Sequence, residues 1–195
     1  NADVVFAPST EEMYPEGFCT YVIQGKLIDS LCGRLRPGHF NGVTTIVTKL
    51  FNIIRPDRAY FGQKDYQQSI VIKKLVTDLN MEVDIKVLPT VRDEDGLALS
   101  SRNKRLNPEE RHSALCIYGS LLKAKSMFAS NIKDSKEIIE EMTSIIKKAK
   151  HTRIDYISIV NAHTLEDVSS INGKAVAAVA VWIGNTRLID NLILE

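Results

Sequence analysis

Helical and strand-like patterns alternate over the first half of the chain, and this alternation constrains the fold more than any other feature. Between residues 43 and 88, apolar residues recur twice at a helical period, and each helical stretch is followed by a short strand-like run. The predicted elements are a strand at Asp3 to Ala7, a helix at Val43 to Ile54, a strand at Arg58 to Phe61 ending at Gly62, a helix at Tyr66 to Asn80 and a strand at Glu82 to Leu88. This order predicts an α/β fold with a parallel sheet covered by helices.

The pattern changes near Asn107, where a second, smaller unit is predicted to begin. Asn107 is a good helix N-cap, Pro108 suits a first helical turn, and the two glutamates that follow favour the positive end of a helix. The predicted elements are helices from Asn107 to about Ala129 and from Ser135 to Lys150, and strands at Ile154 to Val160, Lys174 to Ile183 and Arg187 to Leu194. We therefore divide the chain into residues 1–106 and an α+β domain at residues 107–195.

Charge, hydropathy and cysteine usage exclude several classes of protein. The net charge of +1 gives no strong field toward nucleic acid or an anionic membrane. No apolar run approaches the roughly 20 residues that cross a bilayer. The three cysteines form no CxxC pair and have no metal-site spacing, which is typical of a reduced, cytoplasmic protein.

The first candidate site is Gly62 to Asp65, at the carboxyl end of a predicted strand, where parallel sheets bind ligands. Gly62 lets the backbone approach a ligand, and Lys64 supplies positive charge to a triphosphate. Asp65 is expected to cap the next helix or to hold Mg²⁺, and Gln67 and Gln68 to hydrogen-bond a small substrate. The alternative is a simple turn into a helix, with a solvated lysine and a capping aspartate.

The second candidate is the polar segment from Thr90 to Asn103, which contains Gly96 and leads into Ser100, Ser101 and Arg102. Serine hydroxyls and backbone N–H groups can hold a phosphate, and a guanidinium binds phosphate oxygens in a fork geometry. Such a segment can close over a triphosphate and stabilise departing pyrophosphate. The alternative is a flexible interdomain loop.

The remaining polar residues give weaker signals. Arg36 and His39 flank a Pro-Gly turn and can meet an anionic ligand, although a lone loop histidine is more often structural. The acidic run at residues 93–95 is expected to face water, and Trp182 to lie in the core. The other histidines, which we expect to have surface or packing roles without partners, are His112, His151 and His163.

Three segments taken together closely resemble the pantothenate synthetase (pantoate–β-alanine ligase) family. They are Arg36 to Phe40, Phe61 to Gln68 and Asp95 to Asn103, and the similarity continues through Val181 to Asn191. The resemblance implies that residues 1–106 are the C-terminal part of a Rossmann-like, adenylyl-transferring nucleotide-binding domain, and that residues 107–195 form a lid domain.

The resemblance also implies a reaction that uses ATP and Mg²⁺. The carboxylate of pantoate attacks the α-phosphate of ATP, which gives pantoyl adenylate and pyrophosphate, and the amine of β-alanine then displaces AMP. The implied partners are these small molecules, without nucleic acid or membrane, and the full-length protein is implied to be a homodimer.

The resemblance also implies roles for individual residues, by their position in the matching segments. The implied ATP-binding residues are Gly62, Gln63, Lys64, Asp65, Val91, Leu99, Ser100, Ser101 and Arg102. Val91 resembles an adenosine contact, and Gln68 resembles a pantoate ligand. Arg36 and His39 match a segment near the family's active site. Many relatives carry glutamate at the position of Gln63.

The family's catalytic histidine motif has no counterpart between Asn1 and Glu195, so no residue here is assigned a catalytic role. We therefore expect the chain to be a piece of a longer protein, with little activity alone. Two alternatives stay open. One is another nucleotidyltransferase of the same superfamily, and the other is a non-catalytic fragment that binds nucleotide or self-associates.

Overall fold

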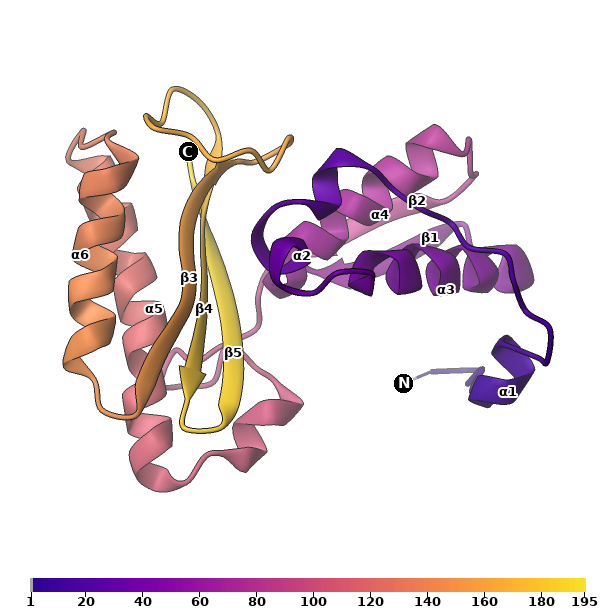
Figure 1. Ribbon diagram of the computed structural model, residues 1–195, viewed down its shortest axis with the longest axis horizontal. Coiled ribbons are helices and arrows are strands. Elements are labelled where there is room, and N and C mark those ends of the chain that lie inside the picture. Colours follow the sequence, from indigo (N-terminus) through magenta and orange to yellow (C-terminus); the bar gives the residue numbers. More distant parts are fainter. Residues whose placement is uncertain (1) are drawn as a thin grey trace.

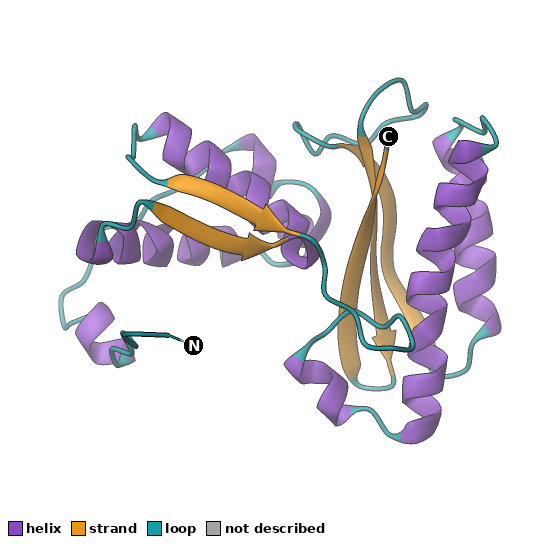
Figure 2. Cartoon of the chain, turned by 180° about the vertical axis from the view of Figure 1, so that it is seen from behind, coloured by secondary structure: helices purple, strands orange, loops and turns teal. Residues whose placement is uncertain are grey.

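Two sheets, each packed against its own pair of helices, organise residues 2–195, the part of the chain that the computed structural model describes (Figure 1). The first unit contains a two-stranded sheet, and the second contains a three-stranded sheet with two long helices along one side (Figure 2). Among residues 2–195, no helix combines the length and the apolar character of a membrane span.

The first unit is built around a parallel pair of strands. Its elements are α1 (Thr10–Met13), η1 (Lys26–Ile28), α2 (Leu31–Leu35), α3 (His39–Ile54), β1 (Arg58–Gly62), η2 (Gln63–Asp65), α4 (Tyr66–Asp78) and β2 (Asp84–Leu88). Phe61 and Ile85 pack into an apolar cluster with Val47 of α3 and with Ile72 and Leu75 of α4. Since the register runs from Arg58–Asp84 to Gly62–Leu88, both strands end at one edge, where η2 begins.

The prediction for residues 43–88 is confirmed, but the strand predicted at Asp3 to Ala7 is wrong. Val4 and Val5 are 84% and 80% exposed, and their backbone pairs with no strand among residues 2–195. A short apolar run signals burial in a strand only if a neighbouring strand is there to satisfy its backbone groups.

The second unit consists of η3 (Ser101–Arg105), α5 (Pro108–Ala129), α6 (Ser135–Lys148), β3 (Thr152–Asn161), β4 (Ala175–Ile183) and β5 (Thr186–Leu194). The strands form an antiparallel sheet in the order β3-β4-β5. The predicted N-cap is present: Asn107 Oδ1 accepts from the Glu110 N–H at 2.9 Å, and Glu110 Oε2 accepts from the Asn107 N–H at 3.0 Å. This reciprocal pair fixes where α5 begins.

Strand β4 joins the two units because both of its faces are buried. Ala177, Val179 and Val181 belong to the apolar cluster of α5 and α6. The side chains between them point the other way, and Val176 and Ala178 pack in a cluster with Leu31 and Tyr66 of the first unit. Leu97, which precedes the proposed domain boundary, belongs to the cluster of α5 and α6, so a boundary at residues 106–107 stays a prediction.

Two expectations about side-chain surroundings are wrong, and a third is incomplete. Trp182 is partly exposed, and the guanidinium of Arg153 lies 4.9 Å from its ring centroid. Asp93 and Asp95 do not simply face water, since each lies 2.7 Å from the Arg111 guanidinium of α5. His151 lies at the surface as expected, but its Nε2 is 3.6 Å from the Glu109 carboxylate, which the sequence did not indicate. In each case a residue distant in sequence supplies the contact.

Two adjacent leucines of α5 test the contribution of the core. Leu121 is 0% exposed and Leu122 is 45% exposed. Leu121→Ala should lower the free energy of unfolding by roughly 2–5 kcal/mol because it leaves a cavity between α5 and the sheet. The matched control Leu122→Ala should lower it by less than about 1 kcal/mol. Urea denaturation measures both, and equal losses would contradict this description of the core.

Candidate functional site

A cavity of about 260 Å³ lies at the junction of the two units, beyond the carboxyl ends of β1 and β2. Seven residues predicted from the sequence line it together: Arg36, His39, Lys64, Asp65, Gln67, Gln68 and Arg102. The walls also contain Tyr156 of β3, Ala178 of β4, and Arg187, Asp190 and Asn191 of β5. Segments far apart in sequence therefore converge on one concave surface, as a ligand site requires.

A second cavity of about 480 Å³ shares Arg36, Arg102 and Arg187 with the first. Arg105 also lines it, and its one acidic residue is Asp155. Four guanidinium groups facing one carboxylate leave a surplus of positive charge that favours a polyanion.

A larger cavity of about 840 Å³ lies elsewhere, between the start of α5 and the end of α6. It contains none of the predicted site residues, and its walls are mainly apolar. Because the residues of the predicted site converge on the junction cavity and not on this one, we take the junction cavity as the candidate site.

The turn at the end of β1 presents Lys64 and Asp65 to the junction cavity. A Cβ at Gly62 would meet nothing within 4 Å, so the surface above this glycine is open to a ligand. Asp65 occupies the N-cap position of α4, but its side chain makes no capping hydrogen bond, so the predicted cap is wrong. Its exposed carboxylate has no hydrogen-bond partner within residues 2–195 and faces the cavity.

The two glutamines after this turn differ in role. Gln67 is 5% exposed, and its amide donates to the Leu27 and Ser30 carbonyls at 2.8 Å while accepting from the Gly33 N–H at 3.3 Å. Gln67 also lines the cavity, but its amide N–H groups are used within the chain, so its side chain fastens the segment before α2 and does not donate to a substrate as expected. Gln68 lines the cavity.

The segment from Val91 to Leu99 forms a tight hairpin closed by backbone hydrogen bonds: Leu99 N–H to Val91 O, and Asp93 N–H to Leu97 O, both at 2.9 Å. Gly96 adopts a positive φ of 88° at its tip, where a Cβ would lie 2.7 Å from the Tyr118 ring. The hairpin delivers the chain to Ser100, whose hydroxyl oxygen accepts from the Arg102 N–H at 3.2 Å. This contact starts η3 and directs Arg102 to the cavities.

The other predicted ATP-binding residues do not line either cavity. They are Gly62, Gln63, Val91, Leu99, Ser100 and Ser101. Val91 and Leu99 expose 65% and 48% of their surface on the hairpin. A ligand that contacts them must extend outside the cavities, over the surface between the hairpin and η2.

Arg187, Asp190 and Asn191 were not predicted as site residues, although they lie in the C-terminal segment that resembles the family. Arg187 Nε donates to Asp155 at 2.8 Å, whereas Arg187 Nη2 is buried without a partner. Burial opposes the charge of Arg187, yet the hydrogen bond to Asp155 raises the pKa of its guanidinium above the usual range. Polar residues inside an otherwise apolar strand are the signal that could have identified them.

His39 begins α3, and its Nε2 lies 3.3 Å from Arg36 Nη1. Burial lowers the pKa of His39 below its ordinary 6.5, the Arg36 charge lowers it further, and the Asp65 charge opposes both. The imidazole is therefore neutral at pH 7. An arginine N–H can only donate, so Nε2 acts as the acceptor.

The charges around His39 predict how its titration responds to substitution. Arg36→Gln should raise the pKa of His39 part of the way toward 6.5, and Asp65→Asn should lower it further. Below pH 6.5 the unfolded chain binds the proton first, so this group removes stability as the pH falls from 6.5 toward the lowered pKa. NMR titration of the imidazole measures each shift, and a pKa at or above 6.5 in the unaltered chain would contradict the assignment.

Comparison with known proteins identifies the family. The family model described as pantoate–β-alanine ligase matches residues 1–193. The chain is 56% identical to the pantothenate synthetase of Acetivibrio thermocellus, covering 99% of this chain and 69% of the relative. The crystal structure of pantothenate synthetase from Thermus thermophilus superposes with a TM-score of 0.92 at 44% identity, covering 97% of this chain and 69% of that one.

A third relative carries ligands. The pantoate–β-alanine ligase from Francisella tularensis, complexed with β-γ ATP and β-alanine, is 33% identical with a TM-score of 0.70. It matches 94% of this chain, which corresponds to 61% of that structure. The match over residues 1–193, together with these identities, shows that the chain belongs to the pantoate–β-alanine ligase family.

Proposed function

We propose that this chain binds ATP and pantoate at the junction cavity for the ATP-dependent joining of pantoate to β-alanine. Membership of the ligase family supports the overall reaction. The observation that carries the assignment of the site is the convergence of Lys64 and Gln68 from one segment with Arg102 from another. They meet beyond the carboxyl ends of parallel strands, where α/β sheets bind ligands.

The proposed reaction has two balanced steps. A pantoate carboxylate oxygen bonds to the α-phosphorus as the bond to the bridging oxygen of pyrophosphate breaks. The β-alanine amine then bonds to the acyl carbon, the bond to AMP breaks, and the amine loses a proton. Phosphoryl transfer of this kind depends on holding the reacting groups in position and on offsetting the negative charge of the phosphates.

The cationic side chains of the two cavities offset the negative charge of the phosphates. Lys64 meets the phosphates as a point charge, and Arg102 and Arg187 present planar donor forks. Arg187 lines both cavities, so its guanidinium charge lies beside the proposed phosphates. We therefore add Arg187 to the proposed phosphate-binding residues.

The side chains of the site could bind Mg²⁺ only together with a substrate whose phosphates supply further oxygen ligands. No group of three or more His, Cys, Asp or Glu side chains suited to a metal occurs among the described residues. Mg²⁺ commonly binds through one or two carboxylates plus substrate phosphates, and the exposed carboxylate of Asp65 in the cavity wall meets that requirement. The ion would neutralise charge on the phosphates.

The remaining assignments are proposed contacts. Gln68 is the proposed pantoate ligand. Val91 offers exposed apolar surface to the adenosine, and Leu99 and Ser101 flank Ser100 along the proposed path of the phosphates. Ser100 Oγ accepts a hydrogen bond, so its own proton is free to be donated to a phosphate. Gly62 and Gln63 are proposed to contact ATP through their backbone groups.

The cellular setting and the assembly are also proposals. The three free cysteines, Cys19, Cys32 and Cys116, support a reducing, cytoplasmic location. A homodimer of the full-length protein and little activity of residues 1–195 alone stay predictions from the family resemblance.

Lys64 provides the direct test of the phosphate site. Lys64→Ala in the complete enzyme should slow pyrophosphate release from ATP, Mg²⁺ and pantoate by ~10²–10³, because a preorganised charge-stabilising group is lost. Stability should change little, since Lys64 forms no ion pair among the described residues. Lys73→Ala, on the exposed face of α4, is the matched control and should leave the rate unchanged.

The same assay separates the alternatives. Release that requires pantoate supports the ligase, and equal release with other small carboxylic acids would favour a different nucleotidyltransferase. An unchanged rate in Lys64→Ala would rule out its phosphate role.

A further inference from the structure

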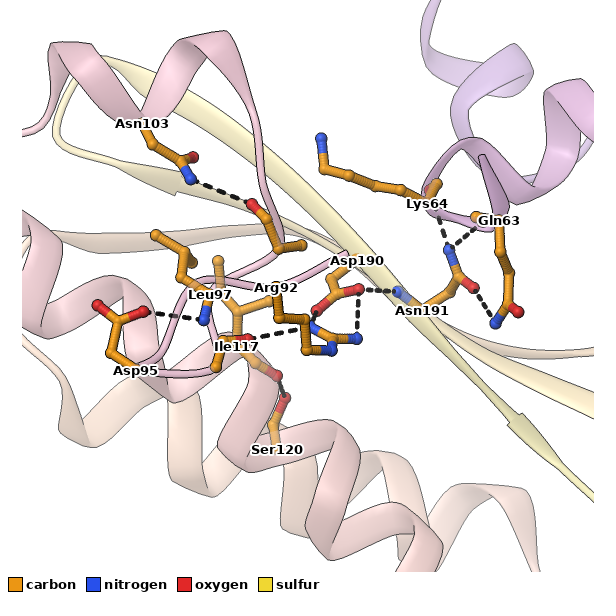
Figure 3. A network of polar contacts seen from close by, with 12 residues as sticks. Gln63, Lys64, Arg92, Asp95, Leu97, Asn103, Ile117, Ser120, Asp190 and Asn191 are labelled. Atoms are coloured by element: carbon orange, nitrogen blue, oxygen red, sulfur yellow. Dashed lines mark hydrogen bonds and ion pairs between the residues drawn. The ribbon is translucent and has the colours of Figure 1, made fainter. Parts of the chain in front are cut away.

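The side chain of Asn191 in β5 forms hydrogen bonds with the turn that carries Lys64 (Figure 3). Its amide donates to the Gln63 carbonyl at 3.0 Å and to the Lys64 carbonyl at 2.9 Å, and its Oδ1 accepts from Gln63 Nε2 at 3.4 Å. Asn191 is 3% exposed, so none of these bonds is readily replaced by water. Both N–H donors of this side chain are thus used on η2, and its oxygen accepts from the same turn.

Its neighbour Asp190 binds the other proposed phosphate-binding segment, the hairpin that leads to Ser100 and Arg102. Asp190 is 3% exposed and forms a two-bonded ion pair with Arg92, at 2.6 Å and 3.1 Å. Arg92 Nη1 also donates to the Gly96 carbonyl at 3.1 Å, and its guanidinium lies 3.8 Å from the centroid of the Tyr118 ring. The hairpin that leads to Ser100 and Arg102 is therefore anchored to β5.

Successive residues of a strand point to opposite sides, which is how two adjacent positions can hold two separate segments. Figure 3 shows Asp190 reaching toward Arg92 while Asn191 reaches toward Gln63 and Lys64. A further bond, from the Asn191 N–H to Asp190 Oδ1 at 2.8 Å, orients the carboxylate. The strand acts as a rigid spacer between the two segments.

We propose that Asn191 and Asp190 are positioning residues for the ligation, which together fix the separation between Lys64 and Ser100–Arg102. This inference rests on the proposed phosphate roles of those residues. Neither positioning residue needs to touch ATP. Asn191 acts on affinity by holding the carbonyls of Gln63 and Lys64, the two backbone carbonyls that flank the Cα atom of Lys64.

A double-mutant cycle on ATP affinity tests Asn191, with calorimetry on this chain in the presence of Mg²⁺. Asn191→Leu should weaken ATP binding on the order of 10-fold when Lys64 is present, since two buried hydrogen bonds are lost. In a Lys64→Ala background it should weaken binding by less than about 2-fold, because the group that it positions is gone. Affinity for adenosine, which has no phosphates, should not change.

Thr152→Val is the matched structural control. Thr152 Oγ1 also lies 3.0 Å from two backbone carbonyls at the end of another element, those of Ile146 and Ala149, which line neither cavity of the candidate site. It should lower stability and leave ATP affinity unchanged. If Asn191→Leu does not fold, the smaller Asn191→Ala removes the same two donors without adding a charge and takes its place in the cycle.

Three outcomes would overturn the inference, and they are distinguishable. Equal weakening of ATP binding with and without Lys64 would mean that Asn191 acts independently of it. Loss of adenosine affinity in Asn191→Leu would indicate a general structural effect. Absence of ATP binding by the unaltered chain would instead overturn the proposed function on which the inference rests.

Discussion

The double-sided burial of β4 is the constraint on which the rest of the structure depends. One face of the strand packs on α5 and α6, and the other packs on Leu31 and Tyr66 of the first unit. Apolar burial stabilises by roughly 25 cal/mol per Å² and needs no precise geometry. It can therefore bring the two units together, but it cannot by itself place individual ligand groups.

Polar contacts at the rim of this apolar junction supply the missing precision. Tyr66 donates its hydroxyl proton to the Ala162 carbonyl at 2.9 Å, and Gln67 fastens the segment before α2. The Asp190–Arg92 pair and the Asn191 amide do the same for the hairpin and for η2. Because each of these groups is buried or nearly so, an alternative arrangement would leave it unsatisfied, which gives the junction one preferred geometry.

Local signals made much of the fold predictable. The start of α5 is encoded by Asn107, Pro108 and Glu110, which lie within four positions of one another, and the β4–β5 turn by Gly184 and Asn185. The order of helices and strands from residue 43 to residue 88 follows from the periodicity of their apolar residues. These features depend on neighbours in sequence, so a sequence pattern can reveal them.

The wrong predictions concern residues whose contacts depend on partners far away in sequence. Gln67 looks like a ligand residue until its partner Leu27, 40 positions earlier, is known, and the partner of Asp190 lies 98 positions away in sequence. The strand predicted near the N-terminus failed for lack of a paired strand among the described residues. For the candidate site, motif similarity located Lys64, Gln68 and Arg102, whereas the residues that bind or hold these segments from β5 became apparent only in three dimensions.

The small side chains of β4 have a consequence for the size of the cavity. Ala178 belongs both to the apolar contact with Leu31 and Tyr66 and to the wall of the cavity. A single methyl group there lets the first unit approach the strand closely while leaving room beside it. The width of the opening between the units is thus set by side-chain volume on a strand that carries no reactive group. A family with this architecture can adjust the fit of its ligand by exchanging a small apolar residue in the cavity wall, without changing any charged group.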